Sequence, residues 1–63
     1  MTALPMFTAY RKAAALADTT RQPAVVIALK PDTLDQYDAM TAEEYHRNPR
    51  AGFFFDVIAP DED

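Results

Sequence analysis

Few residues of this 63-residue chain could take part in catalysis or bind a metal ion. His46 is the single histidine and there is no cysteine, so a multi-histidine site and a thiolate site are both excluded. Gly52 is the single glycine, which excludes a glycine-rich phosphate-binding loop. We therefore expect no enzymatic activity, no cofactor and no metal ion.

Three carboxylates, Asp32, Asp35 and Asp38, recur at every third position, as the ligands of some cation sites do. The spacing does not match a calcium-binding loop, because no glycine follows and the ligand order differs. The same residues need no ion if a helix begins beside them, because negative charge is stabilising near a helix N-terminus. This second interpretation places the three residues in the first turns of a helix.

Charge is divided unevenly along the chain, whose net charge is −4. Residues 1–30 hold four basic residues and one acidic residue, a balance of +3, whereas residues 31–63 hold two basic and nine acidic residues, a balance of −7. The two halves should attract each other within a chain or between chains. The acidic half also offers a face to a protein with a basic surface, through the candidate residues Asp35, Asp38, Glu43 and Glu44. The alternative is that these acids only keep one helix face solvated.

The length allows one small domain, which we place at residues 1–60, and we expect residues 61–63 to be a disordered acidic tail. The longest uncharged apolar runs, Ala24–Leu29 and Ala51–Phe55, are far shorter than the roughly 20 residues of a membrane-spanning helix. The first residues lack the basic region of a signal peptide. We expect a cytoplasmic protein that binds neither membranes nor, given its acidic balance, nucleic acid directly.

Five prolines divide the chain into segments, because proline lacks a backbone donor and favours the boundaries of elements. Residues Met6–Thr20 are rich in alanine and predict a helix. The inward face of this helix would consist of Met6, Tyr10, Ala13 and Ala17. Residues Ala24–Lys30 contain a run of β-branched side chains and predict a strand. Both faces of this strand are apolar, so it should be covered on both sides or lie centrally in a sheet.

Residues Asp32–Asn48 predict a helix in two parts, with a break near Met40. The second part would begin at Thr41-Ala42-Glu43-Glu44, which has the form of a capping box. Residues Ala51–Ala59 predict a second strand. The expected fold is a small α+β domain in the order helix, strand, helix, strand, with two strands packed against two helices. The strands are parallel if the crossover is right-handed and antiparallel if the chain reverses.

The triplet Phe53-Phe54-Phe55 is the most distinctive feature of the sequence. Alternation along a strand places Phe53 and Phe55 on one face, and Phe54, Asp56 and Ile58 on the other. If a helix covers each face, all three phenylalanines belong to the core. If not, Phe54, Asp56 and Ile58 form an apolar contact strip with one charge, for another copy or another protein.

A two-stranded sheet is rarely stable alone, and a chain of this length buries little apolar surface. Pairing of the edge strands at Phe53–Ile58 across a two-fold axis would extend the sheet and remove an exposed edge. We therefore expect a homodimer.

These observations favour a small non-enzymatic protein-binding module, which acts as a regulator or inhibitor by occupying a surface of a partner protein. An alternative from another class is a structural subunit of a larger protein assembly. The regulator should be a folded monomer or dimer in isolation, whereas the subunit should aggregate or remain unfolded.

Two stretches of the chain resemble small phage proteins that inhibit host RNA polymerase. These are Thr33-Leu34-Asp35, and Ala51-Gly52-Phe53 followed by Pro60. The resemblance implies a second alternative, an acidic phage-type inhibitor of a host nucleic-acid enzyme. The last strand here lacks the basic residues that such a resemblance leads one to expect, so no contact residue is carried over from that family.

Overall fold

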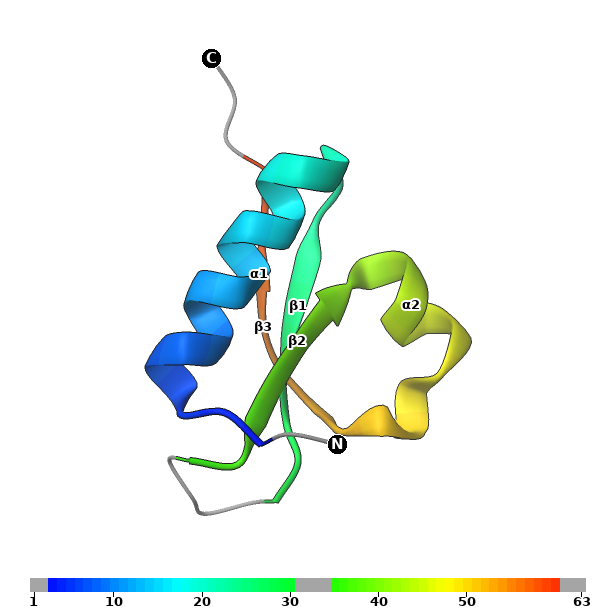
Figure 1. The fold of residues 1–63 in the computed structure, drawn as a ribbon. Coiled ribbons are helices and arrows are strands. Elements are labelled where there is room, and N and C mark those ends of the chain that lie inside the picture. The colour runs from blue at the N-terminus through cyan, green and yellow to red at the C-terminus, as the bar shows by residue number, and fades with distance from the viewer. Residues whose placement is uncertain (1–2, 31–34, 61–63) are drawn as a thin grey trace.

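The computed structural model describes residues 3–30 and 35–60 (Figure 1). Its elements, in chain order, are α1 (Met6–Thr20), β1 (Ala24–Ala28), β2 (Tyr37–Thr41), α2 (Ala42–Arg47), the 3-10 helix η1 (Pro49–Ala51) and β3 (Phe53–Ile58). The three strands form one antiparallel sheet in the order β2-β1-β3. The longer helix α1 and the shorter helix α2 lie on opposite sides of this sheet. The expected α+β class is confirmed.

Helix α1 has the bounds that the sequence predicts. It begins after Pro5, and it ends where Arg21 adopts a left-handed conformation (φ 60°) and donates its backbone N–H to the carbonyl of Ala17 at 2.8 Å. Its inward face is a stripe of small residues, Ala9, Ala13 and Ala17, which are fully buried. These small side chains let the helix backbone approach the sheet closely.

Strand β1 is the central strand, and all five of its residues are buried. Ala24, Val26 and Ala28 belong to the core under α1. Ile27 lies on the opposite face and is also fully buried. The prediction of a central strand covered on both sides is therefore confirmed.

The predicted first part of the second helix is wrong, because Tyr37–Thr41 is the edge strand β2. Tyr37, Ala39 and Thr41 are buried, and the residues between them are half-buried, which is the two-residue alternation of a strand. Tyr37 and Thr41 are also four residues apart, so their spacing fits a helix equally well. Asp32, Thr33 and Leu34, which the sequence predicts in the same helix, lie outside the described residues.

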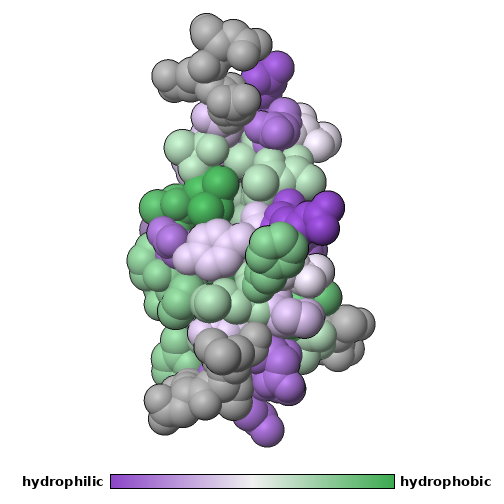
Figure 2. All heavy atoms as spheres, turned by 90° about the vertical axis from the view of Figure 1, so that its left-hand side faces the viewer, coloured by the Kyte–Doolittle hydropathy of each residue, from purple (hydrophilic) through white to green (hydrophobic). Residues whose placement is uncertain are grey.

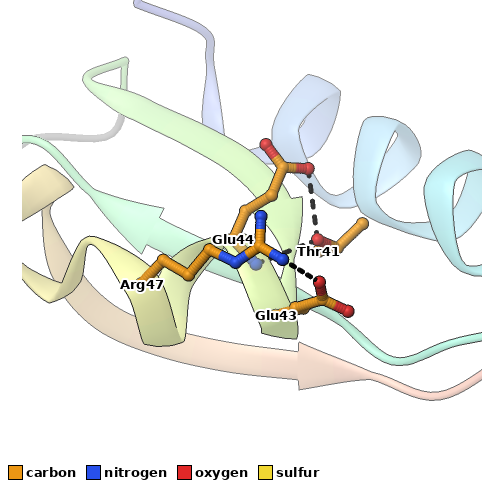
Figure 3. A network of polar contacts seen from close by, with 4 residues as sticks. All are labelled: Thr41, Glu43, Glu44 and Arg47. Atoms are coloured by element: carbon orange, nitrogen blue, oxygen red, sulfur yellow. Dashed lines mark hydrogen bonds and ion pairs between the residues drawn. The ribbon is translucent and has the colours of Figure 1, made fainter.

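The predicted second part of that helix is confirmed as α2. Thr41 is its N-cap: the Thr41 hydroxyl oxygen accepts the backbone N–H of Glu44 at 3.1 Å and donates to the Glu44 carboxylate at 3.1 Å (Figure 3). The same residue therefore ends β2 and begins α2. The order of elements is helix, strand, strand, helix, strand, with one strand more than the sequence predicts.

Strand β3 pairs with β1 in an antiparallel register, which decides between the two orientations left open by the sequence. Val26 faces Asp56 and Ile27 faces Phe54, so Phe55 is the extra residue of a β-bulge. Just before the strand, Gly52 passes so close to β1 that a Cβ there would lie 2.9 Å from Cδ1 of Ile27. Glycine is needed here for close approach.

The core is built mainly from small side chains. Six of the ten buried hydrophobic residues among those described are alanines, and only Ile27 and Val26 are large and fully buried. Most of the phenylalanine surface, in contrast, faces solvent. None of the helices in the described ranges is long and apolar enough to cross a membrane.

Candidate protein-contact surface

The outer strand β3 exposes four large apolar side chains, which we call the β3 ridge: Phe53, Phe54, Phe55 and Val57. Their exposed fractions are 62%, 57%, 45% and 49%, in that order. Hydrophobic residues scattered singly over a surface are ordinary, but neighbouring ones on one strand make a continuous patch. The interpretation in which all three phenylalanines lie in the core therefore does not describe this structure.

The bulge at Phe55 distributes the β3 ridge over both faces of the sheet. Phe54 lies on the face of α2, where its ring centroid is 6.3 Å from that of Tyr45. Phe55 lies on the face of α1, with its ring centroid 5.1 Å from that of Tyr37 and 6.3 Å from that of Tyr10, in edge-to-face geometry. A partner that follows the outer edge of β3 meets apolar side chains on both faces.

Figure 2 faces the side of the molecule where α1 lies. Apolar side chains, in green, gather in the middle of this surface among fewer hydrophilic ones, in purple. Helix α1 adds Phe7 to the exposed apolar residues, with an exposed fraction of 71% and the guanidinium of Arg11 5.7 Å from its ring centroid. This cation–π contact partly screens Phe7 and distinguishes it from the β3 ridge.

Asp56 interrupts the apolar character of β3 and is tied to α1. The Tyr10 hydroxyl donates to Oδ2 of Asp56 at 2.6 Å, and the backbone N–H of Val57 donates to Oδ1 at 2.8 Å. The hydrogen bond from Tyr10, and after it the one from Val57, holds the pKa of Asp56 below its usual value. The same bond to Asp56, with some desolvation, raises the pKa of Tyr10 to about 12. Asp56 is therefore an ionised acceptor at neutral pH.

The opposite edge of the sheet, at β2, is partly closed by the chain itself. Leu4 and Tyr37 exchange two backbone hydrogen bonds, both of 2.9 Å, which add a short bridge outside β2. Farther along, Asp38 accepts the backbone N–H of Ala39 at 2.8 Å and the ammonium of Lys12 at 2.8 Å. Pairing and charge of this kind are the devices that protect sheet edges.

Strand β3 has no such bridge among the described residues, and its register shows which backbone groups point outward. The N–H of Leu29 donates to the carbonyl of Gln36 at 2.7 Å, on the side of β2. Because these directions alternate along a strand, Ile27 and Val25 also point their backbone groups toward β2. On β3, Phe54 lies opposite Ile27 and Val57 lies opposite Val25. The backbone N–H and C=O groups of Phe54 and Val57 therefore point away from β1, toward the open edge of the sheet.

These two outward positions differ. The N–H of Val57 is already bonded to the carboxylate of Asp56. Phe54 has no comparable side-chain contact in the described part of the chain, so its N–H and C=O are the groups best placed to meet another backbone. The edge of β3 is thus open at one point and blocked by the bulge and Asp56 beyond it.

Two of the predicted acidic contact residues lie in or near β2. Asp38 forms its ion pair with Lys12 across the sheet edge, and it does not lie in a helix as the sequence predicted. Asp35 lies in a bend before β2 and is exposed. The interpretation that both residues complement a helix dipole is therefore wrong.

The other two, Glu43 and Glu44, lie in the first turn of α2 (Figure 3). Glu43 forms an ion pair with Arg47 one turn later, and Glu44 accepts the Thr41 hydroxyl. Three of the four acidic candidates, Asp38, Glu43 and Glu44, therefore form contacts within the chain.

The predicted strip of Phe54, Asp56 and Ile58 is divided by the bulge. Asp56 and Ile58 face Val26 and Ala24 on the side of α1, and Ile58 packs against the core. Phe54 lies on the other face, opposite Ile27. An extra residue in a strand shifts the alternation of every residue after it.

Strand alternation alone did not identify Phe53, Phe55 and Val57 as members of the same exposed patch as Phe54. The phenylalanine triplet itself was the available signal, because three consecutive large apolar residues cannot all be buried by one-sided packing. Tyr10 was expected only as an inward residue of α1. No sequence feature pointed to its bond with Asp56, which lies 46 residues away.

Within the described residues, no group of three or more histidine, aspartate or glutamate side chains could hold a metal ion. Comparison of the chain with protein-family models, with curated proteins and with solved structures finds no match. The assignment of the candidate surface therefore depends on the geometry of this structure alone.

Proposed function

We propose that this protein is a small non-enzymatic binding module of the cytoplasm, which regulates or inhibits a partner protein by occupying its surface. The contact is made by the β3 ridge. This narrows the expectation from the sequence: of the predicted contact residues it keeps Phe54 on the edge strand and leaves out the acidic residues.

The observation that supports this proposal is the distribution of apolar side chains between core and surface. The core is filled largely with alanine, while Phe53, Phe54, Phe55 and Val57 remain 45–62% exposed on one outer strand. Leaving that much aromatic surface in water is unfavourable, and burial of aromatic anchors is a main source of binding energy at protein interfaces. A contact surface accounts for both facts.

Capture from a lysate of the native host tests the proposal. The unaltered chain should retain a partner protein, and Phe54→Ser should lose it. Phe7→Ser is the matched control, because it removes an exposed phenylalanine outside the β3 ridge and should leave capture unchanged. Equal capture by both variants, or no partner for the unaltered chain, would overturn the proposal.

The salt dependence of capture separates this surface from an acidic one. An apolar contact should persist as ionic strength rises, because salt screens charges and leaves hydrophobic burial intact. Capture that disappears at high salt would indicate that acidic residues, such as the exposed Asp35, make the contact.

A further inference from the structure

We propose that the β3 ridge of the free protein binds a second copy of this chain, through antiparallel pairing of two β3 strands about a two-fold axis at Phe54. This inference rests on the proposed function, in which the β3 ridge is a contact surface. In the absence of a target protein, the second copy would occupy that surface. The dimer then covers the ridge, and a target must displace the second copy.

The backbone groups determine where the axis passes. A two-fold axis between antiparallel strands can pass through a pair of equivalent residues that exchange both of their backbone hydrogen bonds with each other. Phe54 and Val57 are the outward-facing positions of β3. At Val57 the N–H is already bonded to Asp56, so Phe54 is the position that can exchange both bonds.

The side chains of the β3 ridge fit this register. With Phe54 opposite the partner's Phe54, each Phe53 faces the partner's Phe55 on the side of α1. Four phenylalanine rings then meet on that face and two on the other, and aromatic cross-strand pairs stabilise sheets. The surface is therefore complementary to itself, as an interface about a two-fold axis requires.

Charge supports the same register. An axis at Asp56 would place two carboxylates directly opposite each other, whereas the axis at Phe54 places each Asp56 opposite the partner's Gly52.

The available area predicts a weak dimer. With roughly 200 Å² for a whole phenylalanine side chain, the four exposed side chains offer roughly 400 Å² per copy. That is about half of the roughly 800 Å² per partner of a typical stable interface. We expect reversible association at micromolar concentration, which leaves the ridge available to a target that buries more of it.

Sedimentation equilibrium tests the dimer. The unaltered chain should change from monomer to dimer across the micromolar range, and Phe54→Lys should weaken association about tenfold or more, because two like charges would then face each other at the axis. Phe7→Lys is the control and should leave association unchanged. A monomer at high micromolar concentration, or species larger than a dimer, would overturn the proposal.

Cross-linking tests the register, since the chain has no cysteine of its own. Phe54→Cys should form a disulfide-linked dimer under mild oxidation, because residues paired at the axis lie about 5.5 Å apart at Cα, within disulfide range. Val57→Cys is the matched control on the same strand and face. Its two copies would be roughly 20 Å apart and should not cross-link. Equal cross-linking of both variants, or cross-linking of Val57→Cys alone, would contradict the register.

The two proposals fail in different ways. If the chain is a monomer but Phe54→Ser still abolishes target capture, the second copy is excluded and the proposed function stands. If the chain forms the expected dimer but capture does not depend on Phe54, the ridge serves self-association and the proposed function is wrong. Circular dichroism of each variant serves as the control that its fold is retained in each comparison.

Discussion

The Tyr10 hydroxyl and the Asp56 carboxylate are joined by a 2.6 Å hydrogen bond that connects the N-terminal half of α1 to the edge strand β3. Lys12 and Asp38 make the equivalent connection from α1 to the other edge strand, at 2.8 Å. In both strands the same aspartate also accepts the N–H of the following residue. One helix therefore fixes both edges of the sheet through one carboxylate on each.

The bond between Tyr10 and Asp56 makes stability depend on pH at both extremes. The pKa of Asp56 is lowered on folding, so its contribution is present above the usual value of 3.8 and is lost as the pH falls through the folded value. The pKa of Tyr10 is raised from 10.0 to about 12, so its contribution is present below pH 10 and is lost as the pH approaches 12.

Tyr10→Phe should therefore lower the free energy of unfolding at neutral pH and have little effect at either extreme. Urea unfolding across the pH range measures this difference. Titration of tyrosinate absorbance gives a second readout, in which the transition near pH 12 should disappear from the variant. If the variant instead lost a transition near the ordinary pKa of 10.0, the bond would not form in solution.

Gly52→Ala should destabilise the fold, because the new methyl group would lie 2.9 Å from Cδ1 of Ile27 and 3.0 Å from the carbonyl oxygen of Ala28. The backbone atom cannot move without shifting β1. We expect a loss of about 1–3 kcal/mol in the free energy of unfolding. Ala59→Gly is a useful comparison at an exposed residue just after β3, and it should cost clearly less.

Ala13→Leu should be among the most damaging single substitutions, because Ala13 is fully buried where α1 approaches the sheet. The larger side chain must push the helix away from β1 and β2, at a cost of about 1–3 kcal/mol or more. Ala14→Leu is the matched control, since Ala14 is exposed on the same helix. Thermal unfolding of the two variants should separate them, and equal midpoints would contradict the packing of α1.

Thr41→Ala should cost about 1 kcal/mol, because it removes the side-chain cap of α2. Thr41→Ser keeps the hydroxyl and should recover most of this loss. Denaturant unfolding measures both variants. If serine and alanine were equally destabilising, the lost contacts of the Thr41 methyl group would matter more than the cap.

The elements with local signals could be predicted from the sequence. Helix α1 follows from its alanine run, and β1 follows from its β-branched residues between prolines. The capping residues at Thr41 and Glu44 gave the start of α2. Each of these signals acts within a few residues and does not depend on tertiary contacts.

Strand β2 could not be predicted in the same way. Tyr37 and Thr41 fit the spacing of either a helix or a strand. The charge of Asp38 also fits the N-terminus of a helix, but in the structure Asp38 forms an ion pair with Lys12. Pairing with the central strand decides the outcome, and that is a tertiary effect. The position of the contact surface depended on the bulge at Phe55, which nothing in the local sequence marks.

The central position of β1 also has a consequence for dynamics. Its backbone amides alternate between two neighbours, so Val25 and Ile27 bond toward β2, while Val26 and Ala28 bond toward β3. The link to β2 is a short local connection, whereas β3 returns from much farther along the chain and is the less buried neighbour. Hydrogen exchange along this one strand should therefore alternate, with faster exchange at Val26 and Ala28 reporting each opening of β3 while the β1–β2 hairpin stays closed.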